Sequence, residues 1–171
     1  MLDAISPRRA PLPTTPMLLF LDTSALAKRY LAETGSGWVR AVIDPASGNT
    51  IAVANITRVE IGAAIARRQR DPRSQMSLAD RDALIHFFDH HVAHEYLLVA
   101  TTAHIIDTAY HLTQQYQLRG YDALQLGSAL ILNEVLVATG VPALTVVASD
   151  RELLLAAHAE GLLTDDPVLH P

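Results

Sequence analysis

The stretch Leu18-Leu-Phe-Leu21-Asp22-Thr-Ser-Ala-Leu26 decides the fold class. Residues 18–21 contain no polar side chain, which is typical of a short parallel strand buried on both faces. An acidic residue follows at once, and residues 23–31 have helical character. A buried strand that passes directly into a helix predicts the alternating order of an α/β protein.

The same alternation continues along the chain. Further short strands are expected at residues 51–53, 97–99, 144–148 and 162–163. Helices are expected at residues 23–31, 35–43, 57–68, 77–92, 103–116, 122–133 and 151–160. We therefore expect an α/β fold, a three-layer α/β/α sandwich around a central, mostly parallel sheet of about five short strands. One domain is expected over residues 17–171, after a flexible, proline-rich arm over residues 1–16, with Met17 as the functional beginning.

Composition excludes several classes of protein. Half of the 171 residues are hydrophobic (50%) and none is cysteine, which excludes a disordered chain, a disulfide scaffold and a thiolate metal site. The 13 Lys+Arg and 18 Asp+Glu give a net charge of −5, so nucleic-acid binding would need a local basic surface. The longest apolar stretch, residues 135–148, is interrupted by Thr139, Gly140 and Pro142. No membrane segment is therefore expected, and the predicted location is cytoplasmic.

Four acidic residues stand at the ends of predicted elements. Ligands of parallel sheets bind outside the carboxyl ends of the strands, where Asp22 and Asp150 would lie, although both residues also suit a helix N-cap. Glu60 has the spacing of a capping box with Thr57, and that spacing alone favours a capping role. Asp122 heads an apolar helix whose polar exceptions form one stripe, Asp122, Gln125 and Ser128, so this stripe should face a polar cleft.

Converging carboxylates would repel one another unless a cation is bound. Oxygen ligands without Cys or His suit Mg²⁺ or Mn²⁺, and such ions support phosphodiester hydrolysis. Spacing alone does not establish that the four residues converge.

Several blocks carry a more specific signal when they are taken in order. They are Leu-Phe-Leu-Asp22-Thr-Ser-Ala-Leu, Ala-Lys-Arg-Tyr-Leu up to Gly35-Ser, Thr57-Arg-Val-Glu60 before an Ala-rich helix, Leu118-Arg-Gly-Tyr-Asp122-Ala-Leu-Gln-Leu, and Ala148-Ser-Asp150-Arg-Glu-Leu-Leu followed by Ala-Glu-Gly-Leu162. From about Met17 to the end, the chain resembles the PIN-domain ribonucleases, specifically the VapC-type toxins of VapBC toxin–antitoxin modules.

The resemblance implies a function and a set of site residues. It makes Asp22, Glu60 and Asp122 the acidic core of a catalytic metal site, with Asp150 as a more variable fourth member and Ser24 as a lining hydroxyl. Members of the family cleave RNA in single-stranded or loop regions with Mg²⁺ or Mn²⁺ and without a covalent intermediate. The expected partners are RNA, a second copy of the chain, and a cognate antitoxin that reaches the acids with a basic side chain.

Basic residues near the acids are candidates for RNA contact, because Arg and Lys position phosphates. The residues that we expect to contact substrate or line the site are Ser24, Arg58, Arg119 and Gln125. Lys28, Arg29 and Arg151 also neighbour the acids, although each basic residue taken singly suits a solvated surface. A denser cluster, Arg67, Arg68, Arg70 and Arg73, is interpreted as helix C-terminal charge that favours solubility.

The sequence also allows other functions, which it supports less well. A non-catalytic PIN-like module that binds RNA or protein is the main alternative, and the presence of all four acids argues against it. A haloacid-dehalogenase-type phosphatase needs an acid where Ser24 stands, and a phospho-receiver domain needs paired acids after its first strand. His86, His90, His91 and His94 have the i, i+4 spacing of zinc ligands, but a solvated helix face is the favoured interpretation.

Overall fold

The computed structural model describes residues 16–170, so the predicted arm, apart from Pro16, lies outside the described residues. Five parallel strands form one sheet in the order β3-β2-β1-β4-β5. The strands are β1 (Leu18–Leu21), β2 (Thr50–Ala54), β3 (Tyr96–Val99), β4 (Thr145–Val147) and β5 (Leu163–Asp165). The predicted sheet is confirmed, and it is entirely parallel.

Seven α-helices and two short 3₁₀ helices occur within residues 16–170. The α-helices are α1 (Thr23–Tyr30), α2 (Ser36–Ile43), α3 (Thr57–Arg70), α4 (Leu78–His94), α5 (Ala103–Gln115), α6 (Gly120–Ala138) and α7 (Arg151–Ala159). The 3₁₀ helices are η1 (Pro45–Ser47) and η2 (Pro167–Leu169). No helix in this part of the chain is both long and apolar enough to cross a membrane.

Helix α6 differs from its predicted bounds at both ends. It begins at Gly120, so Asp122 lies in its first turn, where the carboxylate accepts a hydrogen bond from the Arg119 backbone N–H (3.2 Å). At the other end the helix runs on to Ala138, and Gly140 follows with a left-handed φ of 76°. A left-handed glycine is a common helix stop.

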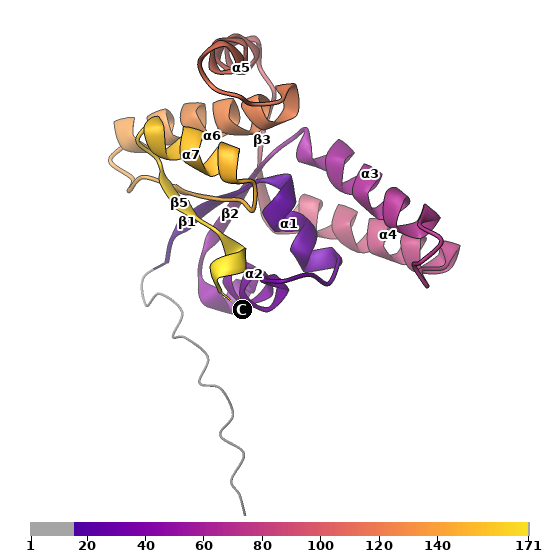
Figure 1. The fold of residues 1–171 in the computed structure, drawn as a ribbon. Helices are drawn as coiled ribbons and strands as arrows, with labels where there is room; N and C mark the ends of the chain where they lie inside the picture. The colour runs from indigo at the N-terminus through magenta and orange to yellow at the C-terminus, as the bar shows by residue number, and fades with distance from the viewer. Residues whose placement is uncertain (1–15, 171) are drawn as a thin grey trace, which may run out of the picture.

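Helices cover both faces of the sheet, which explains why the strands lack an alternating pattern (Figure 1). Leu19 and Leu21 of β1 point into a core that they share with residues of α1–α4, such as Leu26. Phe20 points to the opposite face, where it packs in a second core with residues of α5, α6 and α7, such as Leu126. The predicted three-layer α/β/α sandwich is therefore confirmed.

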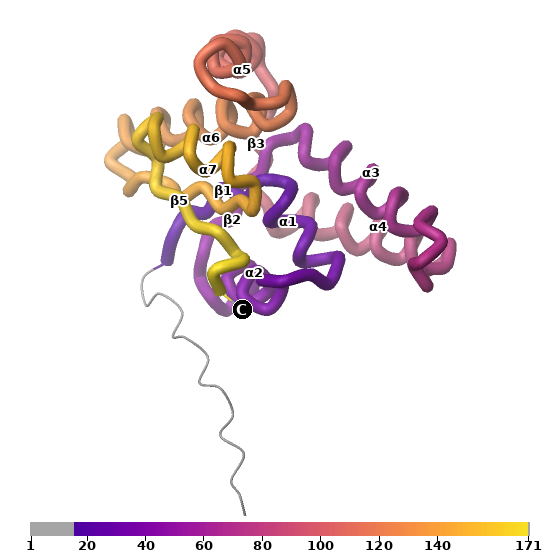
Figure 2. The backbone as a smooth tube through the Cα atoms, in the orientation of Figure 1, coloured from indigo at the N-terminus to yellow at the C-terminus, as the bar shows by residue number. Residues whose placement is uncertain are grey.

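The order of the strands places two of the predicted acids side by side. Leu21 pairs with Val147 in the register of β1 and β4, and the Asp22 backbone N–H donates to the Val147 carbonyl (3.0 Å). Beyond these strand ends the backbone enters α1 and α7, as Figure 2 traces. The carboxyl edge of the sheet at β1 and β4 is therefore where the site is built.

The turn between α1 and α2 approaches the C-terminal segment closely. Gly35 has φ 86°, and a Cβ atom there would meet the backbone carbonyl of Pro167 in η2. Beside this contact, the rings of Trp38 and His170 stack with centroids 4.4 Å apart. The turn therefore depends on glycine for both its backbone conformation and its space.

Candidate active site

A cleft of about 520 Å³ opens at the carboxyl edge of the sheet. It is lined by Asp22, Thr23, Ser24, Ala27, Lys28, Leu31, Ala32, Glu33, Glu60, Ala64, Arg67, Arg68, Asp71, Asp122, Ser149 and Asp150. All four predicted acids and Ser24 are in this set. The structure thus provides the convergence that spacing alone could not establish.

Asp22 both caps α1 and lines the cleft. Its carboxylate accepts a hydrogen bond from the Ser24 backbone N–H (2.9 Å), and only 6% of the residue is exposed. Burial, with a smaller contribution from the negative charge of Glu60, raises the pKa of Asp22 to about 6. The cap and the site are therefore two roles of one residue.

Glu60 does not form the capping box that its spacing suggested. Helix α3 has Ile56 at its N-cap, without a side-chain capping bond. The Glu60 carboxylate instead accepts hydrogen bonds from the Thr23 hydroxyl (2.6 Å) and from the Gln125 side-chain amide (2.8 Å). Glu60 is thereby held against α1 and α6 at the cleft.

Gln125 lies behind the cleft instead of on its surface. Its residue is 1% exposed, and its amide nitrogen is 2.9 Å from both the Thr23 and the Thr57 hydroxyls. Its carbonyl oxygen is buried without a hydrogen-bond partner in residues 16–170. The third member of the predicted stripe, Ser128, donates to the Leu124 carbonyl of its own helix (2.7 Å), so the stripe reaches the cleft only in part.

Asp122 and Asp150 complete the acidic group. Burial raises the pKa of Asp122, and the negative charges of Asp150 and Glu60 act in the same direction. Asp150 caps α7 by accepting a hydrogen bond from the Leu153 backbone N–H (3.1 Å). Nearby, the Ser149 backbone N–H donates to the Ser24 hydroxyl (2.8 Å) and ties α1 to the loop before α7.

The arginines that line the cleft are not the ones that the sequence predicted. Arg58 lines a separate hollow with Val59 and Phe88, and Arg119 is outside the lining of the cleft. Arg67 and Arg68, interpreted above as helix-end charge, do line the cleft. Both arginines lie in the last turn of α3, as interpreted, and their position beside the cleft was not predicted.

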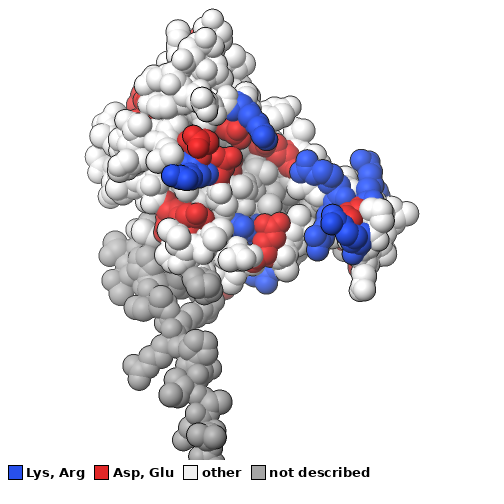
Figure 3. All heavy atoms as spheres, viewed as in Figure 1, with Lys and Arg blue, Asp and Glu red and all other residues white. Residues whose placement is uncertain are grey.

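A helical spacing could have revealed the two arginines. Ala64 follows Glu60 by four residues, and Arg67 and Arg68 follow Ala64 by three and four, which places them on one side of α3. In Figure 3, acidic side chains gather near the starts of α1 and α7, and a basic group covers the far end of α3.

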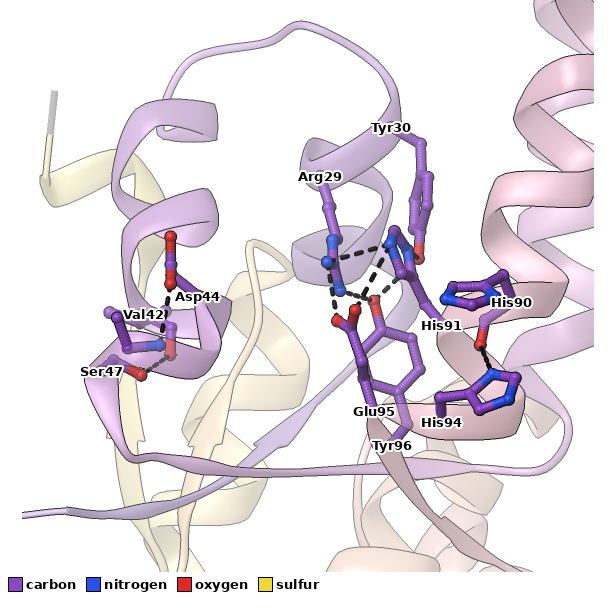
Figure 4. Close-up of polar contacts among 11 residues, drawn as sticks. Arg29, Tyr30, Val42, Asp44, Ser47, His90, His91, His94, Glu95 and Tyr96 are labelled. Atoms are coloured by element: carbon purple, nitrogen blue, oxygen red, sulfur yellow. Dashed lines mark hydrogen bonds and ion pairs between the residues drawn. The ribbon is translucent and has the colours of Figure 1, made fainter.

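The histidines of α4 do not form a metal site. His91 is 2% exposed, and its ring nitrogens contact the Tyr30 hydroxyl (2.9 Å) and the Arg29 guanidinium (3.1 Å), as Figure 4 shows. Burial and the charge of Arg29 lower the pKa of His91. Because no three His, Asp or Glu side chains of residues 16–170 are placed to hold a metal ion, the zinc alternative is wrong. The solvated helix face is also wrong for His91.

The same finding restricts how the acidic cleft can bind a cation. Within residues 16–170 no three His, Asp or Glu side chains lie close enough together to hold one ion. Mg²⁺ accepts this, because it keeps several waters and is commonly bound through one or two carboxylates. The raised pKa values of Asp22 and Asp122 show that negative charge is unfavourable in the cleft, and a divalent cation reverses that effect. The donor set therefore fits Mg²⁺ or Mn²⁺.

Comparisons with known proteins agree with this fold. The PIN domain family model matches residues 19–140, so the chain belongs to the PIN domain family. Within that family it is of the VapC type: it is 33% identical over 155 residues to Ribonuclease VapC45 of Mycobacterium tuberculosis (strain CDC 1551 / Oshkosh), covering 90% of this chain and 99% of the relative. The resemblance found in the sequence is confirmed.

Solved structures share the fold at low sequence identity. VapBC2 from Rickettsia felis, bound to a DNA fragment from their promoter, superimposes with a TM-score of 0.58 at 13% identity and covers 88% of this chain and 98% of its own. The Mycobacterium tuberculosis VapC20, a Sarcin-Ricin loop cleaving toxin, superimposes with a TM-score of 0.57 at 16% identity and covers 90% of this chain and 99% of its own.

Proposed function

We propose that the chain is an endoribonuclease that depends on Mg²⁺ or Mn²⁺ and acts as the toxin of a toxin–antitoxin pair. The observation that carries the proposal is the cleft in which Asp22, Glu60, Asp122 and Asp150 meet from four different parts of the chain. The names of its relative, Ribonuclease VapC45, and of its structural neighbour, the Sarcin-Ricin loop cleaving toxin VapC20, support RNA as the substrate.

The chain's own residues prepare the site for phosphodiester hydrolysis. Carboxylates from this group of four would hold the cation, which when bound would activate water and neutralise charge at the phosphate. Thr23 and Gln125 fix the Glu60 carboxylate, so this group is already oriented before RNA arrives. No side chain is required to form a bond with the substrate.

The test is cleavage of a mixed RNA pool with Mg²⁺, with Mn²⁺ and with EDTA. We expect cleavage in either metal, none in EDTA, and a loss of at least about 100-fold in Asp122→Asn, because a removed ligand weakens both the metal and its alignment. Asp107→Asn is the matched control, since Asp107 is an exposed acid of α5 outside the cleft. Full activity of Asp122→Asn, or cleavage unaffected by EDTA, would show that this metal site does not carry the activity, and no cleavage by the wild type would favour the alternative of a non-catalytic PIN-like module.

Gln125→Met is expected to weaken the response to metal by about 10- to 100-fold, because residues that orient ligands contribute effects of this size. The substitution removes the amide that donates to Glu60 but keeps a similar volume. Cleavage rate against Mn²⁺ concentration measures the effect, and Gln114→Met on the exposed side of α5 is the control. Equal Mn²⁺ dependence in both variants would show that Gln125 serves packing only.

We also propose a cognate antitoxin and a second copy of the chain as partners. The solved neighbour VapBC2 pairs a chain of this fold with another protein. The acidic cleft suits a basic side chain donated by an antitoxin, which would pair with the carboxylates and displace the cation. For a homodimer, α5 offers two exposed apolar side chains one turn apart, Ile106 (52% exposed) and Tyr110 (63% exposed).

A further inference from the structure

Helix α3 brings opposite charges to the two ends of one cleft. Glu60 lies in its first turn, and Arg67 and Arg68 follow two turns later on the cleft side. At a rise of 1.5 Å per residue, the arginines begin about 10 Å along the helix axis from Glu60. The cleft thus has an acidic end at the sheet edge and a basic end farther along α3.

The two arginines are available for a ligand. Neither forms an ion pair with a carboxylate within residues 16–170, and both side chains belong to exposed residues. The neighbouring cations differ, because Arg73 is paired with Asp71 (3.1 Å) and Lys28 with Glu33 (3.2 Å). The positive charge that remains free to act in the cleft is therefore that of Arg67 and Arg68.

We propose that Arg67 and Arg68 form a binding subsite for a phosphate of single-stranded RNA that neighbours the phosphate being cleaved. This inference rests on the proposed function, and it adds residues that hold the substrate without taking part in the chemistry. Guanidinium groups bind phosphate oxygens in a bidentate manner, and such contacts fix the register of a nucleic acid.

RNA fits both ends of the cleft better than an acidic peptide does. A polyanion that enters the cleft needs positive charge at each phosphate, and the cation supplies it at the acids while Arg67 and Arg68 supply it along α3. An acidic peptide would be held at the arginines but would bring further carboxylates toward Asp22 and Glu60, where negative charge is already unfavourable.

The experiment compares Arg67→Gln/Arg68→Gln with Arg70→Gln/Arg81→Gln. The control removes the same charge from the same end of the α3–α4 pair, but neither Arg70 nor Arg81 lines the cleft. Steady-state cleavage of a fluorescein-labelled single-stranded RNA is measured with Mn²⁺ at several salt concentrations. Binding of the same RNA is measured by anisotropy in EDTA, and thermal melting checks that both variants fold.

For Arg67→Gln/Arg68→Gln we expect KM to rise about tenfold with kcat nearly unchanged, and the slope of log KM against log salt to fall by about 0.7, the value for one lost phosphate contact on a single strand. The control should resemble the wild type. Equal KM values and salt slopes in the two variants would overturn the inference. If only inhibition by the antitoxin were lost, the arginines would serve protein recognition, and the inference would also fail.

A failure of the proposed function has a different signature. If the wild type did not cleave RNA, but its RNA binding in EDTA still weakened selectively in Arg67→Gln/Arg68→Gln, the subsite would stand and the ribonuclease activity would not.

Discussion

Asp22→Asn is expected to abolish RNA cleavage and to raise the melting temperature of the metal-free protein. Asparagine keeps the shape of the side chain and can still accept the hydrogen bond from the Ser24 backbone N–H. It removes a buried charge whose pKa is raised to about 6, a shift worth about 1–3 kcal/mol of unfolding free energy at neutral pH. Most substitutions instead destabilise by about 0.5–3 kcal/mol.

The stability that Asp22→Asn gains over the metal-free wild type should depend on pH. The folded protein protonates Asp22 at a higher pH than the unfolded chain does, so this residue makes the metal-free wild type more stable as the pH falls from above 6 toward 4. The advantage of Asp22→Asn should therefore be largest near pH 8 and shrink toward pH 4. Thermal melts in EDTA across this range measure it, with Asp107→Asn as the control.

With Mn²⁺ present, the wild type should melt at a higher temperature than Asp22→Asn. Mn²⁺ stabilises the wild type by mass action, because the folded chain presents the site. The increment should be much smaller in Asp22→Asn, which lacks one proposed ligand. Wild-type and variant melting curves that move equally with Mn²⁺, together with retained cleavage, would leave Asp22 with a capping role alone.

Gly35→Ala is expected to destabilise the protein by about 2–4 kcal/mol and to lower its melting temperature by roughly 5–15 °C. Alanine at φ 86° is strained, and its Cβ would collide with the Pro167 backbone carbonyl, which has no flexible side chain to move aside. The shift is measured by calorimetry or circular dichroism.

Gly37→Ala is the matched control, two residues along the chain. Gly37 is exposed in the first turn of α2, and a Cβ there meets nothing within 4 Å. Replacing glycine by alanine in a helix should stabilise it by about 0.5–1 kcal/mol. If both variants lost the same stability, the close approach of the α1–α2 turn to η2 would not be the cause.

Much of the fold could be predicted because both faces of the sheet are covered. A strand such as Leu18–Leu21 that is buried on two sides leaves an uninterrupted apolar run, which is easily recognised between helices. The bounds of α6 were less accurate, because its first turn is stabilised by a contact between the Arg119 backbone and Asp122 that apolar periodicity does not register.

The acidic residues of the candidate site could be found in the sequence, but the hydrogen bonds that hold Glu60 could not. The acids follow strand ends or begin helices, which are local positions that sequence displays. The hydrogen bonds that hold Glu60 are not local, because Gln125 and Thr23 are 102 residues apart and only the tertiary fold brings them together. The place of Arg67 and Arg68 beside the cleft was missed although it is local, since the same helix, α3, carries them and Glu60.

The strand order also determines when, during synthesis, the cleft can exist. β1 is made first yet lies at the centre of the sheet, and its neighbour β4 is among the last strands to be made. The hydrogen bond from the Asp22 backbone N–H to the Val147 carbonyl cannot form before Val147 is synthesised, and Asp150 is synthesised three residues later. A chain still growing on the ribosome therefore lacks the assembled carboxylates until translation has passed α7. For a ribonuclease, this order prevents activity while the first three strands are being made on the ribosome.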